Sequence, residues 1–176
     1  MKKCLLILVS HLSFFISHRL EIAIAAKKEG YDVKVAIGEL DADIECLNKK
    51  GIDYFHVPID RGGTNFFSDL KSIFLIWKLF KKLKPKIVHL VTIKPYLYGG
   101  IIARIAKVPC VVSAVSGLGS LFIPKNIDSR LYRLFLYPLY KVAFNHHNQC
   151  VILQNSSDAK LLIDWGILKK KKNSIH

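Results

Sequence analysis

The amino-acid sequence predicts an α/β domain built on a parallel β-sheet with helices on both faces. Short apolar runs alternate with longer segments of helical periodicity, which is the order of elements in a parallel sheet. The runs that begin at Leu5, Ile87 and Val111 are continuously apolar, as expected for strands covered on both faces. Hydrophobic residues make up 51% of the 176 residues, which is enough to bury a substantial core.

Six strands are predicted, one at each apolar run, and the three continuously apolar runs are expected at the centre of the sheet. The predicted strands are Leu5 to Val9, Val33 to Ile37, Tyr54 to Val57, Ile87 to Val91, Val111 to Val115 and Val151 to Leu153.

The predicted helices lie between the strands and are bounded by capping and breaking residues. Gly99, Gly100 and Ala103 are small residues that permit a neighbouring segment to approach one of these helices closely. We expect Pro138 to kink or divide another. The predicted helices are Ser17 to Gly30, Asp41 to Lys50, Phe66 to Leu83, a helix from Pro95 that ends before Pro109, Ser129 to about Phe144, and a last helix from Ser156 or Ser157 to Gly166. Arg61 to Asn65 is expected to form a loop.

The charge balance is strongly basic, with 27 Lys and Arg against 13 Asp and Glu and a formal net charge of +14. Such an excess favours an anionic partner, which could be nucleic acid, anionic lipid or a phosphorylated substrate. No zinc-finger, RRM or KH pattern occurs, and the lysines stand beside large apolar side chains on predicted helices. We therefore expect no nucleic-acid partner.

Neither a membrane-spanning helix nor a metal site is expected. The longest apolar run begins at Leu5 and is much shorter than the ~20 residues that a spanning helix needs. The four cysteines are far apart, with no CxxC motif and no matching histidine spacing. They are interpreted as reduced, mostly buried thiols.

Functional residues are expected in the loops that follow the strands, because ligands of an open parallel sheet bind at the carboxyl ends of the strands. Four loops qualify: Ser10 to Ser17, Thr92 to Pro95, Ser116 to Ser120 and Gln154 to Asp158. The first contains no glycine, whereas a dinucleotide-binding turn needs glycines for close approach of the pyrophosphate. A dehydrogenase that binds NAD or FAD is therefore disfavoured, and the absence of a GxxxxGK[ST] motif argues against a P-loop NTPase.

Three stretches of the chain resemble motifs of a known protein family, both in their order along the chain and in their placement at predicted strand ends. They are Ser17 to Leu20; Val88 to Gly99 followed by Ala103-Arg104, Ser116 to Gly119 and Phe122; and Leu153 to Asp158. Together they span nearly the whole chain, and the sequence resembles the N-terminal domain of bacterial family 4 glycosyltransferases that build surface polysaccharides.

The resemblance implies a Rossmann-like domain that is one half of a GT-B fold. In that fold two such domains face each other across a cleft; the first receives the acceptor and the second binds the nucleotide sugar. Residues 1–168 are expected to form the N-terminal domain and residues 169–176 a lysine-rich disordered tail, with the C-terminal donor-binding domain absent. The complete enzyme is expected to transfer a sugar, with retained anomeric configuration, to a lipid-linked or polysaccharide acceptor. The chain alone would be inactive and would hold no cofactor, since the nucleotide sugar is a substrate of the complete enzyme.

Substrate-binding residues implied by the resemblance follow two central strands. Gly117 and Gly119, beside Ser116, would let the backbone approach the phosphates of the acceptor or donor; the alternative is a tight turn that needs glycine only for its dihedral angles. Thr92 and Lys94 would direct a hydroxyl and an ammonium toward sugar hydroxyls or a lipid phosphate. The alternative is a solvated lysine at the start of a helix.

A second group of polar residues follows the first strand. His18 and Arg19 are expected at a helix N-terminus, where an anionic group is stabilised, although His18 could equally be a packing residue. Ser10 and His11 lie in the same loop and are weaker candidates for substrate binding. His146-His147 is interpreted as a polar surface pair.

The catalytic residue is not identified, because many family members have a histidine where this chain has Val115-Ser116. The chain could be the truncated product of an interrupted gene, half of a split enzyme that recruits a separate donor-binding chain, or a noncatalytic membrane-surface binding module.

A membrane-facing surface is predicted on Phe66 to Lys86, and Leu131 to Phe144 is a second segment that could assist membrane attachment. A lipid-linked acceptor must be met at the bilayer, so the protein is expected in the cytoplasm, peripheral on the inner face of the plasma membrane. The alternative is that the aromatic side chains pack on the sheet. The apolar side chains are Phe66, Phe67, Phe74, Trp77 and Phe80, and the basic ones are Lys71, Lys78, Lys81, Lys82, Lys84 and Lys86.

Overall fold

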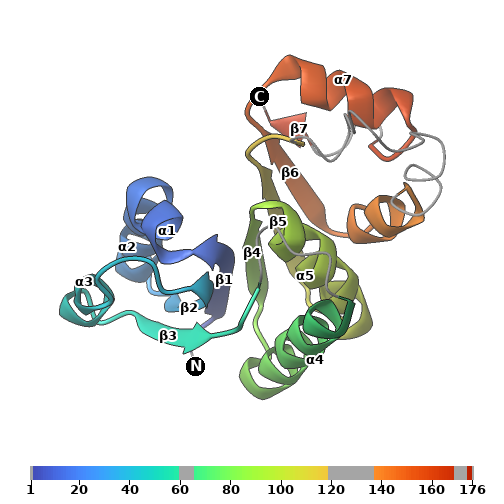
Figure 1. Ribbon diagram of the computed structural model, residues 1–176. Coiled ribbons are helices and arrows are strands. Elements are labelled where there is room, and N and C mark those ends of the chain that lie inside the picture. The colour runs from blue at the N-terminus through green and yellow to red at the C-terminus, as the bar shows by residue number, and fades with distance from the viewer. Residues whose placement is uncertain (1, 60–65, 119–136, 169–173, 176) are drawn as a thin grey trace.

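The computed structural model describes residues 2–59, 66–118, 137–168 and 174–175. These residues form one parallel sheet of seven strands in the order β3-β2-β1-β4-β5-β6-β7 (Figure 1). The three continuously apolar runs form β1, β4 and β5 at its centre, which confirms their predicted position. The strands are β1 (Cys4–His11), β2 (Asp32–Glu39), β3 (Asp53–His56), β4 (Ile87–Val91), β5 (Cys110–Val115), β6 (Gln149–Leu153) and β7 (Ser174–Ile175).

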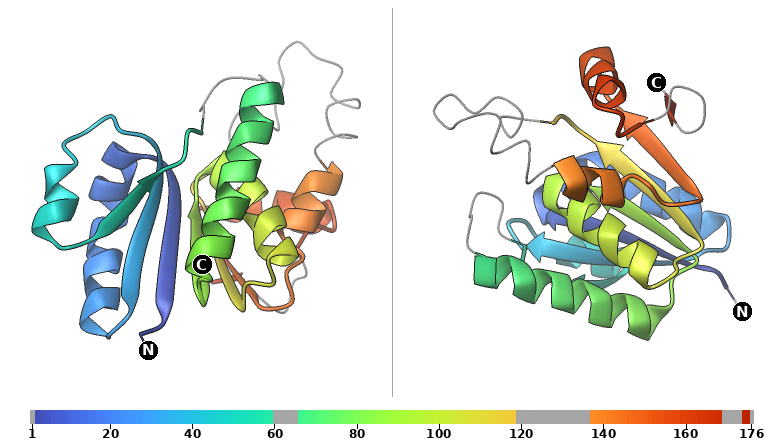
Figure 2. Two further views of the ribbon diagram at one scale, coloured as in Figure 1. Left: turned by 90° about the horizontal axis from the view of Figure 1, so that it is seen from below. Right: turned by 90° about the vertical axis from the view of Figure 1, so that its right-hand side faces the viewer.

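Helices cover both faces of the sheet, as predicted, and Figure 2 shows the two helical layers on either side of it. One layer consists of α1 (Leu12–His18), α2 (Leu20–Lys28) and α3 (Glu45–Lys49). The other consists of α4 (Phe66–Leu83), α5 (Ile93–Ile105), the helical residues 137–143 and α7 (Ser156–Asp164). The chain thus has the Rossmann-like α/β fold that the sequence predicts.

Each face of the sheet has its own core, because successive side chains of a strand point to opposite faces. Leu6 and Leu8 of β1 pack into the core under α4 and α5. Leu5, Ile7 and Val9 pack into the core under α1 and α2. Strand β1 is therefore buried on both sides, which explains why its sequence is continuously apolar.

The small residues of α5 allow close packing, as the sequence predicts. A Cβ added to Gly100 would lie 2.7 Å from the carbonyl oxygen of Ala143, and one added to Gly99 would lie 2.6 Å from Leu90 Cδ2. Helix α5 thus approaches residues 137–143 at one glycine and β4 at the other.

The first helical segment begins earlier than predicted and is divided. Residues 10–17 were expected to form a loop before a helix starting at Ser17, but α1 begins at Leu12, directly after β1. Arg19, with φ −131° and ψ −11°, separates α1 from α2. Its backbone still bonds to both helices, since Arg19 N donates to Phe15 O and Ala23 N donates to Arg19 O. The extended turn expected from the polar residues is therefore a kinked pair of helices.

The C-terminal part of the chain also differs from the prediction of a disordered tail. Residues 174–175 form β7, a short strand parallel to β6, whereas residues 169–173 and 176 lie outside the described residues. The loop predicted at Arg61 to Asn65 and the first part of the helix predicted from Ser129 also lie outside them. Of the helices that the structure describes, none is long and apolar enough to cross a membrane.

Candidate functional site

The carboxyl ends of β1 and β4 lie side by side and bring two hydroxyl groups together. Strands β1 and β4 are hydrogen-bonded neighbours, and the Ser10 Oγ and Thr92 Oγ1 atoms lie 2.6 Å apart. The Thr92 hydroxyl also donates to the carbonyl oxygen of Val91. This hydroxyl pair lies at the sheet edge where ligands of parallel sheets bind.

Thr92 has a backbone conformation that is unfavourable for its side chain. Its φ of 73° and ψ of 165° belong to a region that is occupied almost exclusively by glycine, and Thr is β-branched. Such strain typically occurs at functional positions, where the surrounding structure holds it in place. Thr92 lies between β4 and α5, and Tyr96 N donates to its carbonyl oxygen at the start of that helix.

A histidine and two carboxylates occupy the neighbouring ends of β1 and β2. His11 Nδ1 lies 3.1 Å from Glu39 Oε2 and 3.7 Å from Asp41 Oδ2. Ser13 donates to Asp41 through both its backbone N–H and its hydroxyl. Burial alone would raise the pKa of the Asp41 carboxyl, but the Ser13 hydrogen bonds and nearby His11 hold that pKa below its ordinary value. The group can therefore accept hydrogen bonds from sugar hydroxyls at neutral pH.

Lys94 does not point freely into the site, in contrast to the prediction. Its ammonium lies 2.7 Å from Asp69 Oδ1 of α4, and both side chains are mostly buried. Tyr98, one turn further along α5, also bonds to Asp69, and burial together with that carboxylate raises the Tyr98 pKa. Lys94 thus attaches the start of α5 to the first turn of α4.

The loop after β5 is held by a carboxylate of the chain itself. Gly117 has a φ of +127°, which favours glycine. Leu118 N donates to Asp158 Oδ2 at 3.0 Å, and Asn155 Nδ2 donates to the same oxygen at 3.0 Å. The loop was expected to approach phosphates of the acceptor or donor; in the structure its Leu118 amide binds the side chain of Asp158. Gly119 lies outside the described residues.

His18 and Arg19 are not at the start of a first helix. His18 is the last residue of α1, and its ring stacks on Phe14 with 4.4 Å between the ring centroids. Arg19 follows it at the kink before α2. Because α1 has seven residues, the kink lies ~10 Å along the helix from the strand ends. These two residues are therefore separated from the Ser10–Thr92 pair.

Helix α4 exposes a ridge of large apolar side chains. Phe67 is 80% exposed and Trp77 36%, and Lys78, Lys81 and Lys82 are exposed beyond them along the helix. Phe80, which was expected in the same surface, is only 2% exposed and packs into the core. The other exposed apolar residues of this ridge are Phe66, Leu70 and Phe74.

Several residues of the site were missed or given little weight by the sequence analysis. Ser10 and His11 can be recognised as site residues only from their contacts with Thr92 and Glu39, which lie at the ends of other strands. Nothing in the local sequence distinguishes Glu39 or Asp158 from other surface carboxylates. The polarity of residues just after β1 and β2 was the available signal. The interpretation of His146 and His147 as a polar surface pair is wrong for His146. That residue is buried, and its backbone N–H donates to the side chain of Gln149.

Comparison with known proteins gives a consistent result. The model of the family described as glycosyl transferase 4-like matches residues 4–155. A Campylobacter jejuni N,N'-diacetylbacillosaminyl-diphospho-undecaprenol α-1,3-N-acetylgalactosaminyltransferase is 28% identical over 163 residues, which cover 93% of this chain and 43% of that protein. An Escherichia coli UDP-Gal:α-D-GlcNAc-diphosphoundecaprenol α-1,3-galactosyltransferase is 43% identical over 89 residues, covering 51% of this chain and 23% of that protein.

A structural comparison agrees with the sequence matches on the fold. A glycosyltransferase from Rickettsia africae ESF-5 superimposes with a TM-score of 0.67 at 18% identity, covering 100% of this chain and 43% of that one. The chain therefore spans less than half the length of these relatives, and its fold is that of one half-domain.

Proposed function

Since the chain belongs to the glycosyl transferase 4-like family and has the fold of a GT-B half-domain, we propose that it is the acceptor-side half of a glycosyltransferase. Its acceptor is a saccharide carried on a lipid diphosphate, or the growing polysaccharide itself. The names of both relatives specify acceptors linked to undecaprenyl diphosphate. The net charge of +14 supports this class of acceptor, because a diphosphate is attracted to a basic protein.

The observation that carries the proposal is the strained Thr92 paired with Ser10 at the carboxyl edge of the sheet. The two hydroxyls can donate to and accept from sugar hydroxyls. The carboxylates of Glu39 and Asp41, on the far side of His11, add acceptors to the same edge. Ser116 and Gly117 follow β5 on the other side of β4, and we assign them to the same acceptor site.

The chemical step would depend on positioning and on stabilisation of the leaving diphosphate. This chain would bind and orient the acceptor, and the donor sugar would be held by the other half of the enzyme. We therefore expect no sugar transfer by the isolated chain, since an enzyme cannot stabilise charge on a group that it never contacts. The donor half either continues the same polypeptide or is a separate chain.

Acceptor binding tests the proposal directly. The probe is a short-chain polyprenyl diphosphate carrying one N-acetylhexosamine, titrated into the isolated chain and followed by calorimetry. We expect the wild-type chain to bind it and the double variant Ser10→Ala, Thr92→Val to bind about thirtyfold more weakly, because two hydrogen bonds of about 1 kcal/mol each are lost. Ser17→Ala, an exposed serine of α1, is the control. Equal binding by the double variant, with an unchanged circular-dichroism spectrum, would refute this acceptor site.

We also propose that the α4 ridge rests on the inner face of the plasma membrane. Helix α4 follows the edge strand β3 in the chain and returns antiparallel to the sheet, so Phe66 and Phe67 lie near the edge that carries the acceptor site. The Asp69–Lys94 ion pair connects the same two regions. A lipid-linked acceptor in the bilayer would then reach the site without leaving the membrane surface. The noncatalytic alternative, a membrane-binding module, would retain this surface but not the acceptor binding.

A further inference from the structure

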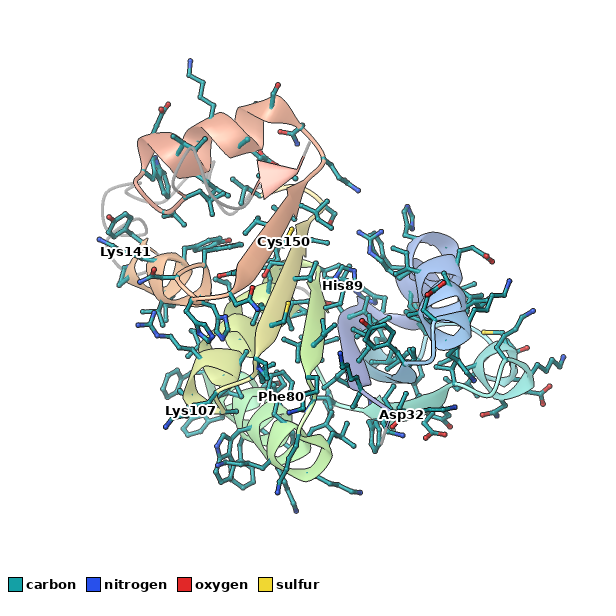
Figure 3. The ribbon with its side chains drawn as sticks, turned by 180° about the vertical axis from the view of Figure 1, so that it is seen from behind. Asp32, Phe80, His89, Lys107, Lys141 and Cys150 are labelled. Carbon is teal, nitrogen blue, oxygen red and sulfur yellow. The ribbon has the colours of Figure 1, made fainter. Side chains whose placement is uncertain are left out.

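The loop that follows β5 lies in the middle of the carboxyl edge of the sheet. Strand β5 lies between β4 and β6, and Figure 3 shows the buried His89 of β4 and Cys150 of β6 on either side of it. The loop begins at Ser116, directly after β5. It therefore lies between Thr92, which follows β4, and helix α7, which follows β6.

A carboxylate in the first turn of α7 holds this loop. Leu118 N donates to Asp158 Oδ2 at 3.0 Å, although 40 positions separate the two residues. Asn155 Nδ2 donates to the same oxygen at 3.0 Å, and Asp158 N donates to Asn155 Oδ1 at 2.7 Å. The Asp158 side chain is thus fixed from two sides, and the Leu118 amide has its partner within the chain.

Leu118 is also anchored by packing. It is 2% exposed and belongs to the core under α4 and α5. Its N–H needs a partner inside the protein, because an unpaired buried donor destabilises the fold. Gly117, with a φ of +127°, turns the chain between β5 and this anchor. Asp158 and the core together therefore fix the position of residues 116–118.

The same carboxylate sets the charge at the loop. Backbone amides of such loops ordinarily bind anions, but the position beside the Leu118 N–H is taken by the negative charge of Asp158. Within the part of the chain that the structure describes, no lysine or arginine lies within ion-pair distance of Asp158. Among those residues its charge is not neutralised, so a phosphate group brought to this loop would be repelled.

We propose that Asp158 determines which part of the acceptor this loop contacts: it positions residues 116–118 for the uncharged saccharide and excludes the lipid diphosphate. The proposal rests on the acceptor function proposed above. Sugar hydroxyls can bond to the Ser116 hydroxyl and to the backbone, whereas phosphate oxygens would meet the Asp158 carboxylate. The acceptor then lies with its saccharide toward β5 and its diphosphate toward α4, where we place the membrane; α4 and α7 lie on opposite sides of α5 (Figure 2).

Removing only the charge tests this assignment. In Asp158→Asn the side-chain oxygen still accepts from Leu118 N, so the loop keeps its position. The probes are the short-chain polyprenyl diphosphate carrying one N-acetylhexosamine and an alkyl glycoside of the same sugar, which has no phosphate. We expect the variant to bind each probe within about twofold of the wild type, because salt screens a diphosphate beyond the sugar ring over a Debye length of ~10 Å at 0.1 M. Tighter binding of the diphosphate probe alone, by about tenfold or more, would place the phosphate at the loop and overturn the proposal.

Removing the whole side chain tests the positioning role. Asp158→Ala leaves the Leu118 N–H without its acceptor, so the loop should lose its fixed position and both probes should bind about tenfold more weakly. Asp158→Asn should restore both affinities, and Asp164→Ala, an exposed aspartate at the other end of α7, is the matched control. Unchanged binding by Asp158→Ala, or equal losses in Asp158→Ala and Asp158→Asn, would contradict the positioning role. The Asp158→Asn comparison stands by itself if Asp158→Ala does not fold.

Inorganic pyrophosphate separates failure of this proposal from failure of the acceptor function. The amide signals of Gly117 and Leu118 are followed by NMR in the full chain as pyrophosphate is added. They should stay in place in the wild type and move in a saturable manner in Asp158→Ala, where both the charge and the competing acceptor are gone. Movement in the wild type, or no movement in Asp158→Ala, would overturn the exclusion of phosphate by Asp158. A wild-type chain that binds neither sugar probe would refute the acceptor function, and the pyrophosphate titration would still decide whether Asp158 excludes phosphate.

Discussion

The hydroxyl oxygens of Ser10 and Thr92 lie 2.6 Å apart although 82 positions separate the two residues. Their approach follows from the pairing of β1 with β4, which places both strand ends at the same edge. The contact also fixes the side chain of a residue whose backbone is strained. This strained hydroxyl pair is the observation on which we base the proposed acceptor site.

Thr92→Gly should separate stability from binding. Glycine adopts φ 73° without steric penalty, so the variant should gain up to about 1 kcal/mol in the free energy of unfolding after losing the hydroxyl's hydrogen bond. Binding of the lipid-diphosphate acceptor should fall about tenfold. Urea unfolding and calorimetry measure the two quantities. A variant that binds normally would mean that the strain has no functional role.

The Asp69–Lys94 pair should contribute to the fold. Asp69→Asn or Lys94→Met alone should lower the free energy of unfolding by about 2 kcal/mol, because each removes one charge of a mostly buried ion pair. The double variant should lose less than the sum of the single losses. The exposed Glu45–Lys49 pair, 3.9 Å apart, is the control and should show a coupling of about 0.3 kcal/mol. Additive losses at Asp69 and Lys94 would contradict the ion pair.

His89 should make the isolated chain sensitive to mild acid. Its folded-state pKa is about 4, below its ordinary value of 6.5, so the unfolded chain binds a proton that the folded chain does not. Stability attributed to neutral His89 is complete above pH 6.5 and is lost as the pH falls toward 4, by about 3 kcal/mol in total.

The His89→Leu variant measures this effect, because all other titrating groups remain in both proteins. Urea unfolding between pH 4 and 7 should show a flatter pH dependence for the variant. Parallel curves for the two proteins would mean that His89 is protonated equally in the folded and unfolded states.

Gly100→Ala should destabilise the chain despite the higher helix propensity of alanine. The new methyl group would lie 2.7 Å from the carbonyl oxygen of Ala143, and backbone atoms cannot move without displacing residues 137–143. We expect a loss of about 2 kcal/mol. Gly99→Ala is the matched comparison, since its methyl group would meet the end of the Leu90 side chain, which can rotate. A smaller loss at Gly100 than at Gly99 would contradict the packing described here.

The α4 ridge should bind vesicles that contain anionic lipid. Exposed Lys78, Lys81 and Lys82 each contribute about 1 kcal/mol near an anionic surface, and salt weakens this attraction over a Debye length of ~10 Å at 0.1 M. Co-sedimentation should therefore fall at high salt, and it should fall when these three lysines are replaced by glutamate.

A charge-matched control distinguishes this surface from a general effect of net charge. Replacement of the exposed Lys28, Lys49 and Lys50 by glutamate changes the charge equally on the other side of the sheet. That triple variant should retain most of the binding. Equal loss in both triple variants, or no binding by the wild type at low salt, would count against the membrane surface.

The sequence predicted the elements that depend on local pattern. Helix α4 begins at Phe66 and ends at Leu83, as its composition and Pro85 indicate, and β4 spans Ile87 to Val91 as its apolar run indicates. The order of motifs identified the family, and the family model agrees. Where polar residues followed a strand, as at Ser10 to Ser17, the local pattern misled, because helix α1 is fixed by the burial of Leu12 and Phe15.

The sequence by itself thus determined six of the seven described strands, most of the helices and the two-sided burial of the central strands, and it predicted the edge of the sheet at which we propose that the acceptor binds. Only the tertiary structure decided that Ser10 meets Thr92, that Asp69 holds Lys94, that Asp158 holds the loop at Leu118, and that Phe80 and His146 are buried. The physical reason is the distance along the chain over which each kind of interaction acts. Periodicity and capping act within a few residues, whereas these contacts join segments whose distance in space is set by strand order and helix packing.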